Sequence, residues 1–353
     1  TVQFHCWYFF WALTMEEKNF LVLAQNRKFL PYYGESQKKW EEPFFFIQAA
    51  DTQYGMHASY KLKNLDLGWE EEIAWSKQLV KDINAMYPKP KFLVVCGDLT
   101  DAFPDSHPDL RKRQVKDFKK VFAGLDIPLV CVCGNHDVGN TPTPSTVAGY
   151  KKDFGDDYFS FWCGGVFFIV LNSQFYEDAS KTAALAAEQE IWLEEQLEIV
   201  RNENPQHAVV FQHIPWFISF PEEDKEYFNM EYGLRMEMLE RFHSAGIRYI
   251  FCGHYHRNAG GFYKDMEQVI TSAVGVQLGD THHGYRLVRV LENRLVHQYF
   301  ALGTAPTHVH LPSRKPMLPP AAAAAASPAR PVWSFTSTAT GEVTPTRKPS
   351  LAL

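Results

Sequence analysis

The sequence predicts an α/β fold, because short apolar runs of strand length alternate with stretches that carry apolar residues at helical spacing. Residues 44–50 form the first such run, and it ends at Asp51. Residues 69–87 follow with apolar side chains three and four positions apart, and Pro88 stops this helix. With 353 residues, 46% of them hydrophobic and 15% aromatic, the chain is long enough to bury a sizeable core.

The same alternation continues along the chain. Further strands are predicted at residues 91–96, 127–133, 208–212 and 248–252, and further helices at residues 115–125, 188–200 and 232–245. Residues 157–162 and 166–171, joined through Gly164 and Gly165, predict a β-hairpin. Residues 269–272, 285–290 and 294–301 are expected to be the closing strands.

One domain is predicted over residues 44–302. Residues 1–43 show no clear periodicity and are expected to form an N-terminal extension. Residues 303–353 are rich in Pro, Ala and Ser and include six consecutive alanines at residues 321–326. Such a composition cannot bury an apolar core, so it predicts a disordered tail.

The net charge, the length of the apolar segments and the positions of the cysteines limit the classes of protein to which this chain can belong. The net charge is −6 and no dense basic block occurs, which argues against binding nucleic acid. No apolar segment approaches the length that spans a bilayer, and residues 4–13 lack the flanks of a signal peptide. The six cysteines include no Cys-x-x-Cys pair, and most lie in apolar runs, as in a reducing compartment. We therefore expect a cytoplasmic protein without a membrane span.

Polar side chains that suit a metal ion follow five of the predicted strands. They are Asp51 with Gln53, Asp98, Asn135 with His136 and Asp137, His213, and His254 with His256. Ligands in α/β sheets bind outside the carboxyl ends of the strands, so we expect these groups to meet there. Carboxylates, imidazoles and amide oxygens suit divalent transition metals. Each residue alone is explained as well by an ordinary turn; the five groups together favour a site.

Their order resembles the metallophosphoesterase (calcineurin-like) superfamily, whose motifs are Asp-x-His, Gly-Asp, Gly-Asn-His-Asp/Glu, His and Gly-His-x-His. The similarity covers about residues 44–300. It implies a two-sheet sandwich flanked by helices (αββα), with the metal site at the C-terminal ends of strands. It also implies two divalent metal ions, about 3.5–4 Å apart in such sites, and leaves open whether they are Mn, Fe, Zn or Mg.

The resemblance implies a set of metal ligands by position. They are Asp51, Gln53, Asp98, Asn135, His213, His254 and His256. Asp98 is implied to bridge both ions. Gln53 stands where the family usually has histidine, and its neutral amide oxygen is a weaker ligand than imidazole. The first site is therefore expected to bind its ion loosely or to prefer a harder ion; that Gln53 is only a turn residue is an equal alternative.

His136 is the implied catalytic residue and would face the substrate. There it would protonate the leaving oxygen or stabilise charge on the phosphoryl group, and an imidazole pKa near working pH suits that role. Asp101 is a candidate to orient the His136 ring without contacting the metal or the substrate. The simpler alternative is that Asp101 is an ordinary polar loop residue. Asp137 is expected to brace the loop rather than to contact a metal.

Residues 155–162, 171–176 and 253–261 resemble a group of serine/threonine protein phosphatases within the superfamily. This implies in-line attack by a metal-activated hydroxide on a phosphoprotein, with an Akt-type kinase as the implied partner. Two alternatives stay open: a phosphodiesterase or nucleotide hydrolase with the same dinuclear site, and a non-catalytic scaffold that keeps the fold. The sequence contains no phosphate-binding P-loop and no nucleophile elbow to support another chemistry.

Overall fold

The predicted apolar runs pair into two β-sheets in the computed structural model, which describes residues 18–312. The smaller sheet contains β3 (Phe44–Ala49), β4 (Leu93–Cys96), β5 (Leu129–Val132), β12 (Gly284–Val290) and β13 (Leu295–Ala301) in the order β13-β12-β3-β4-β5. The larger sheet contains β1 (Ala24–Gln25), β2 (Lys28–Phe29), β6 (Phe159–Cys163), β7 (Val166–Val170), β8 (His207–Phe211), β9 (Tyr249–Cys252), β10 (Ala259–Tyr263) and β11 (Met266–Ile270). Its order is β1-β2-β6-β7-β8-β9-β11-β10.

Aromatic side chains fill the space between the two sheets. The ring of Phe46 on β3 stacks on Phe92 with centroids 5.0 Å apart, and both lie against Phe168 of β7 and Phe211 of β8. The preceding residue on β3, Phe45, faces the opposite side and packs in a second core. Because both faces of β3 are buried, its sequence is a continuous apolar run instead of an alternating one.

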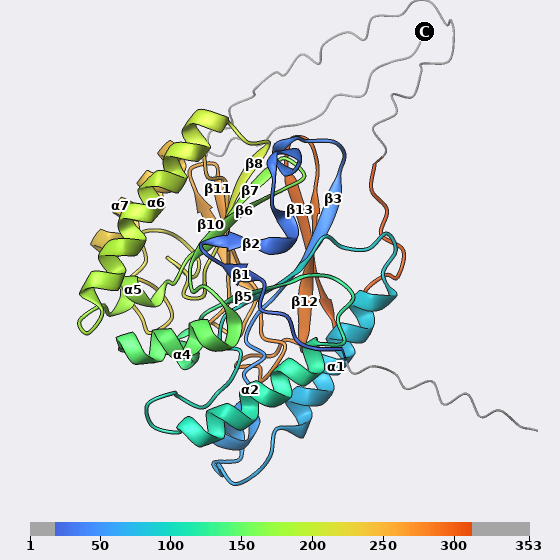
Figure 1. Cartoon of the computed structure of the whole chain (residues 1–353), viewed down its shortest axis with the longest axis vertical. Coiled ribbons are helices and arrows are strands. Elements are labelled where there is room, and N and C mark those ends of the chain that lie inside the picture. Colours follow the sequence, from blue (N-terminus) through green and yellow to red (C-terminus); the bar gives the residue numbers. More distant parts are fainter. Residues whose placement is uncertain (1–17, 313–353) are drawn as a thin grey trace, which may run out of the picture. The chain divides into compact units, whose positions relative to one another are not determined.

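Helices cover the outer face of each sheet (Figure 1). The helices are α1 (Glu70–Ala85), α2 (Pro108–Phe122), α3 (Asn135–Val138), α4 (Pro144–Phe154), α5 (Gln174–Glu177), α6 (Ala183–Glu203) and α7 (Tyr232–Ala245). Leu79 of α1 and Phe118 of α2 pack in the core of the smaller sheet, whereas Leu197 of α6 and Leu239 of α7 pack in that of the larger sheet. The described residues thus form the αββα layers that the resemblance implies.

Strand direction places the functional end of the sandwich. In the smaller sheet β3, β4 and β5 are parallel neighbours, and in the larger sheet β7, β8 and β9 are. Parallel strands bring their carboxyl ends, and the loops that follow them, to one edge of a sheet. The predicted polar groups follow β3, β4, β5, β8 and β9, so both sheets contribute to the same region.

Some elements differ from the sequence-based expectation. The helix expected at residues 115–125 begins at Pro108, where proline suits the first helical turn. The unpredicted helix α4 starts after Thr143, whose hydroxyl accepts a hydrogen bond from the Thr146 N–H. The unpredicted strand β10 contains two adjacent glycines, which local sequence patterns disfavour in strands.

The ends of the described chain also contact the sandwich. β2 pairs with β6 through Lys28 and Ser160, so part of the predicted N-terminal extension lies in the larger sheet. The N–H of Val309 donates to the carbonyl of Tyr87, which ties residues after 302 to the end of α1. Residues 1–17 and the predicted disordered tail from residue 313 onward lie outside the described residues. The domain limits therefore stay predictions.

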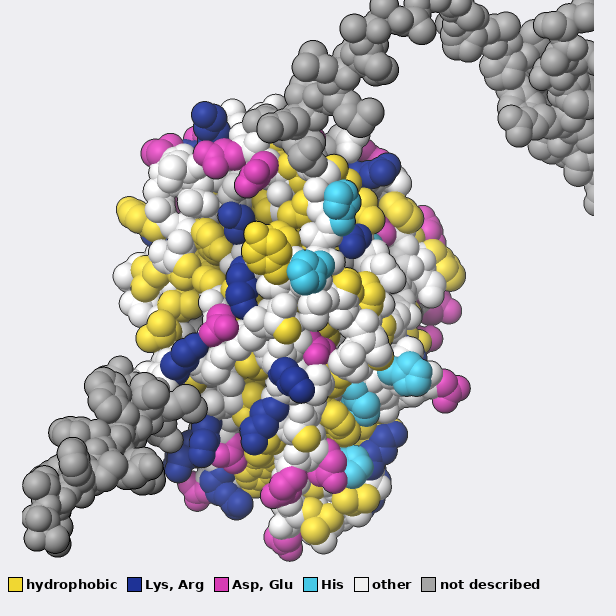
Figure 2. Space-filling model, turned by 90° about the vertical axis from the view of Figure 1, so that its right-hand side faces the viewer, with side chains coloured by type: hydrophobic (Ala, Val, Ile, Leu, Met, Phe, Trp, Pro, Cys, Tyr) yellow, Lys and Arg dark blue, Asp and Glu magenta, His cyan; other side chains and the backbone are white. Residues whose placement is uncertain are grey.

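The cysteines and the surface charges of the described residues follow the pattern that the sequence indicates. Within residues 18–312 all five cysteines are free and buried. On the face seen in Figure 2, Lys and Arg side chains are mixed with Asp and Glu side chains. None of the described helices is long and apolar enough to cross a membrane.

Candidate metal centre

Hydrogen bonds donated by main-chain N–H groups hold the loops of the two sheets together at the site. The N–H of Asp51 donates to the carbonyl of Gly97 over 3.1 Å, so the loops after β3 and β4 run side by side. From the larger sheet, the N–H of His254 donates to the Asp51 carboxylate at 3.1 Å and 3.2 Å. The predicted groups that follow β3, β4 and β9 are thus neighbours in the folded chain.

Unusual backbone conformations aim the side chains inward. Five of the predicted ligands have a left-handed backbone: Asp51 (φ 52°), Gln53 (φ 35°), Asp98 (φ 49°), His254 (φ 68°) and His256 (φ 52°). Residues other than glycine rarely adopt this conformation, and it concentrates at functional sites. Gly134 is needed for a different reason, because a Cβ there would lie 2.1 Å from Oδ1 of Asp98.

Two groups of three residues could each hold a metal ion, and they share one member. Asp98, His213 and His254 form the first group, and Asp51, Asp98 and His256 form the second, with the ligand atoms of each within 4.8 Å of one another. All five residues are buried. A carboxylate shared by two such groups can bridge two ions.

Hydrogen bonds set which nitrogen of His213 and of His256 faces the cluster. Nδ1 of His213 donates to the carbonyl of Cys96 at 2.8 Å, which leaves Nε2 at 3.3 Å from the Asp98 carboxylate. Likewise Nδ1 of His256 donates to the carbonyl of Val276 at 2.6 Å. Metal-binding histidines characteristically donate their other ring nitrogen to such an acceptor. In both residues Nε2 is therefore the nitrogen available to a cation.

Asn135 presents its amide oxygen to the same cluster. Its Nδ2 donates to the side-chain oxygen of Asn140 at 2.9 Å, and its Oδ1 lies 3.1 Å from Nε2 of His213. Nε2 of Gln174 in turn donates to the main-chain carbonyl of Asn140 over 2.8 Å. The sequence did not single out Asn140 or Gln174, because polar loop residues are common and only the folded chain places them behind Asn135.

Gln53 has an oriented amide with an unsatisfied oxygen. Its Nε2 donates to Oδ1 of Asp101 at 3.2 Å, whereas its buried Oε1 has no hydrogen-bond partner among the described residues. Buried amide oxygens in proteins are normally satisfied. Gln53 lines the same pocket as Asp98 and His256, so a cation bound there would satisfy this oxygen.

His136 is fixed against Asp98 and Asp101. Its main-chain N–H donates to Oδ1 of Asp98 at 2.9 Å, and its Nδ1 donates to the main-chain carbonyl of Asp101 at 2.6 Å. The Asp101 carboxylate, expected to orient this ring, lies farther away, with Oδ1 at 3.6 Å. Phe103 stacks on the His136 ring with centroids 4.2 Å apart. Nε2 is left for the pocket that His136 lines.

Asp137 points away from the cluster. Its carboxylate accepts the N–H groups of Leu99, at 3.1 Å and 3.2 Å, and of Gly134, at 2.9 Å. Burial raises the pKa of Asp137 to about 6, although the nearby Arg111 guanidinium opposes that rise. This side chain therefore joins the loops after β4 and β5.

Charges within the cluster favour an ionised Asp98. Burial raises the pKa of its carboxyl, but the positive charges of His213 and His136 outweigh burial and hold it well below its usual range. Burial lowers the pKa of His213, yet the Asp98 carboxylate raises it to about 9 overall. Burial, reinforced by the charge of His213, lowers the pKa of His254. Ionised carboxylate and neutral imidazole are the forms that bind metals, so a cation bound at Nε2 of His213 would displace the proton that the Asp98 carboxylate favours there.

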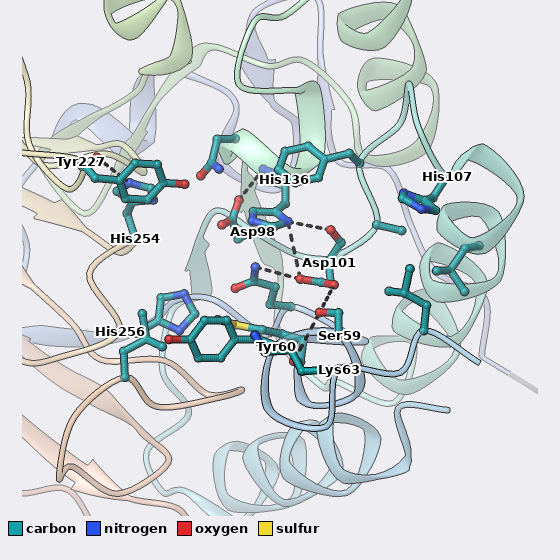
Figure 3. A pocket seen from close by; sticks show the side chains of 18 of the residues that line it. Ser59, Tyr60, Lys63, Asp98, Asp101, His107, His136, Tyr227, His254 and His256 are labelled. Carbon is teal, nitrogen blue, oxygen red and sulfur yellow. Dashed lines mark hydrogen bonds and ion pairs between the residues drawn. The ribbon is translucent and has the colours of Figure 1, made fainter. Parts of the chain in front are cut away.

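A pocket of about 440 Å³ opens beside the cluster (Figure 3). Asp98, His136, His254 and His256 line it together with residues that the sequence did not single out, among them Tyr60, Lys63 and Tyr227. A second hollow of about 390 Å³ adjoins the cluster from the side of Asn140 and also contacts His254 and Tyr227. A molecule that enters either hollow therefore reaches the predicted ligands directly.

Comparison with known proteins decides the family. The model of the family described as calcineurin-like phosphoesterase matches residues 25–258. The chain belongs to this family. The phosphoesterase is 46% identical over 291 residues to serine/threonine-protein phosphatase CPPED1 of Danio rerio, covering 81% of this chain and 94% of that protein. It is 47% identical over 285 residues to the protein of that name from Homo sapiens, covering 79% of this chain and 90% of the relative.

Solved structures show the same fold. A dimetal phosphatase from Danio rerio matches with a TM-score of 0.55 and 14% identity, over 73% of this chain and 96% of that one. Purple acid phosphatase PPD1 from yellow lupin matches with a TM-score of 0.52 and 12% identity, over 77% of this chain and 53% of that one. The predicted α/β class with two sheets and flanking helices is confirmed. By its family, the phosphoesterase is a metal-dependent hydrolase of phosphoric esters.

Proposed function

We propose that this phosphoesterase is a serine/threonine protein phosphatase with two divalent ions bound around Asp98. The observation that carries the proposal is the pair of buried ligand groups that share this carboxylate. About four fifths of the chain is similar to relatives named serine/threonine-protein phosphatase. This similarity supports phosphoproteins as the substrate class.

The residues present fit two ions. Asp51, Asp98, His256 and the Oε1 of Gln53 would hold the first, and Asp98, Asn135, His213 and His254 would hold the second. When bound, two such ions activate a water for in-line attack on phosphorus and neutralise charge on the phosphoryl oxygens. The first set contains three oxygen donors and one nitrogen, which favours a harder ion such as Mn²⁺ or Mg²⁺ at that position.

His136 is proposed as the general acid. The carbonyl of Asp101 fixes Nδ1, and Phe103 holds the plane of the ring, so Nε2 is the atom that exchanges a proton in the pocket. In its protonated form the ring would donate that proton to the departing serine or threonine oxygen. A positioned acid of this kind typically contributes about 10²–10⁴-fold to the rate.

The phosphoprotein itself is proposed from family resemblance. That resemblance points to an Akt-type kinase as the substrate and to the cytoplasm as the location. Neither follows from the geometry of the metal centre, because the same pair of ligand groups could serve other phosphoric esters.

Metal analysis combined with three substrates tests the function. We expect the full chain to bind about two divalent ions and to hydrolyse a phosphothreonine peptide and p-nitrophenyl phosphate. We expect much slower hydrolysis of bis(p-nitrophenyl) phosphate. The matched control is Asp98→Asn, which removes the shared carboxylate charge with little change of shape.

Each alternative predicts a different result. Faster hydrolysis of the bis-ester than of the monoester and the peptide would favour a phosphodiesterase. Hydrolysis of free nucleotides but not of phosphopeptides would favour a nucleotide hydrolase. Two bound ions without hydrolysis of any of these substrates would favour a non-catalytic scaffold.

A further inference from the structure

The pocket beside the cluster extends well beyond the candidate metal ligands. Away from those ligands, five apolar residues line it, and we call them the apolar wall: Met56, Leu65, Ala102, Phe103 and Leu110. They come from the loop after β3, the turn after β4 and the first turn of α2. In Figure 3, His107 marks this side of the pocket, opposite His254. A phosphoryl group at the ligands would leave the wall free for another part of the substrate.

The wall begins at the proposed general acid. Phe103 stacks on His136 with an angle of 30° between the ring planes. Ser59 Oγ donates to Oδ2 of Asp101 at 2.7 Å, and Asp101 contacts Nδ1 of His136 through its carbonyl. Since His136 would protonate the leaving oxygen, the peptide attached to that oxygen must leave the phosphoryl group on the His136 side. The substrate chain next to the phosphorylated residue would therefore run along the wall.

The rim of the wall combines exposed apolar surface with a positive charge. The side chain of Leu65 is 46% exposed. Lys63 lines the same pocket, its Nζ lies 4.5 Å from the centre of the Tyr60 ring, and no carboxylate of the described residues lies within ion-pair distance of it. An unpaired cation beside apolar surface suits a ligand that carries negative charge and an apolar group together. Because the phosphoryl group is placed at the ligands, the apolar surface is left for an apolar side chain of the peptide and Lys63 for a second negative charge.

We infer that the apolar wall is a specificity subsite, which takes the apolar side chain next to the phosphorylated serine or threonine of the substrate. This inference rests on the proposed function as a protein phosphatase. It assigns Leu65 a part in selecting substrates. The proposed roles of the metal ligands and of His136 are unchanged. Phosphopeptides with glycine beside the phosphorylated residue have no side chain to cover the apolar wall, so the wall would stay exposed to water.

Two phosphothreonine peptides of equal length and charge test the subsite. One carries leucine and the other glycine on both sides of the phosphothreonine, and kcat/KM is measured for each with the metal-loaded full chain. We expect about a tenfold higher value for the leucine peptide, mainly through KM, as for apolar contacts in enzyme pockets. Leu65→Ser should lower this ratio, because it removes one of the five apolar side chains of the wall. The matched control Leu62→Ser should keep it, because Leu62 lies on the same segment, is 51% exposed and does not line the pocket.

The outcomes separate this inference from the proposed function. Equal kcat/KM for both peptides in the unaltered protein would overturn the subsite while leaving a protein phosphatase. A tenfold preference that survives Leu65→Ser, with metal content unchanged, would also overturn the assignment to the wall. If p-nitrophenyl phosphate is hydrolysed but neither peptide is, the protein phosphatase function fails, and the subsite fails with it.

Discussion

Gln53 donates its side-chain N–H to the carboxylate of Asp101 over 3.2 Å, and this bond decides which end of the amide faces the candidate metal centre. The carboxylate accepts only, so it selects the nitrogen and leaves the buried Oε1 without a partner. Gln53 can therefore act as an oxygen ligand although its family position usually holds histidine. The alternative of a simple turn residue does not account for a buried, oriented and unsatisfied oxygen.

Loss of the Asp101 carboxylate should weaken the first ion. Asp101→Ala frees the Gln53 amide to rotate, and residues behind metal ligands typically change affinity about 10–100-fold. Competition with a graded chelator, followed by metal analysis, measures this change. Ser59→Ala is the control, since it keeps the Asp101 carboxylate and removes only the Ser59 hydroxyl, which donates to Oδ2 of Asp101 and to the carbonyl of Met56. Equal retention of both ions in Asp101→Ala would contradict the role of this carboxylate.

Replacing Asp98 and replacing Asp51 should leave different numbers of bound metal ions per chain. Asp98 belongs to both ligand groups and Asp51 to one. We therefore expect Asp98→Asn to lose both ions and Asp51→Asn to retain one, with activity largely lost in each. Metal analysis after gel filtration gives the counts. Identical counts in the two variants would show that Asp98 is not shared.

His136→Ala should lower kcat without changing the metal content. We expect a loss of about 10²–10⁴-fold on a phosphothreonine peptide, because the departing alkoxide would leave without a proton. The loss should be much smaller on p-nitrophenyl phosphate, whose leaving group needs little protonation. His243→Ala serves as the control, because His243 lies on α7 and pairs with Asp265. Equal losses on both substrates would argue against acid catalysis.

Glu72 should make stability depend on pH. It is fully buried, and burial raises its pKa, although the hydrogen bond from the His57 N–H partly offsets this. The folded state thus holds the proton more tightly than the unfolded state does. The stability that this group contributes is fully present below its unfolded pKa and is lost as pH rises through its folded pKa.

Thermal unfolding of Glu72→Gln across pH 4 to 8 checks this expectation. Relative to the unaltered protein, the variant should gain Tm at pH 8, where Glu72 must be buried as a charge. The gain should shrink towards pH 4. Glu70→Gln, at an exposed position on the same turn of α1, should show no such pH-dependent gain. A constant difference at every pH would mean that Glu72 does not titrate during unfolding.

Local sequence patterns predicted the main strands and helices well, because each has a strong apolar signal. The helix α7 begins and ends at the predicted residues, and Gly246 closes it with a left-handed backbone. The pattern failed where glycines occupy a strand, as in β10, or where a proline begins a helix early, as in α2. Pairing with neighbouring elements decides those cases, and a local pattern cannot report it.

The sequence by itself determined the kinds of candidate ligand and their order along the chain, since Asp51, Asp98, Asn135, His213 and His254 each follow a buried strand. The family resemblance followed from the same residues. Only the tertiary structure decided which atoms face the cluster. The carbonyls of Cys96 and Val276 select Nε2 of two histidines, and Asp101 selects Oε1 of Gln53. These partners lie up to 117 residues away from the ligand they orient, so only folding brings them into hydrogen-bond distance.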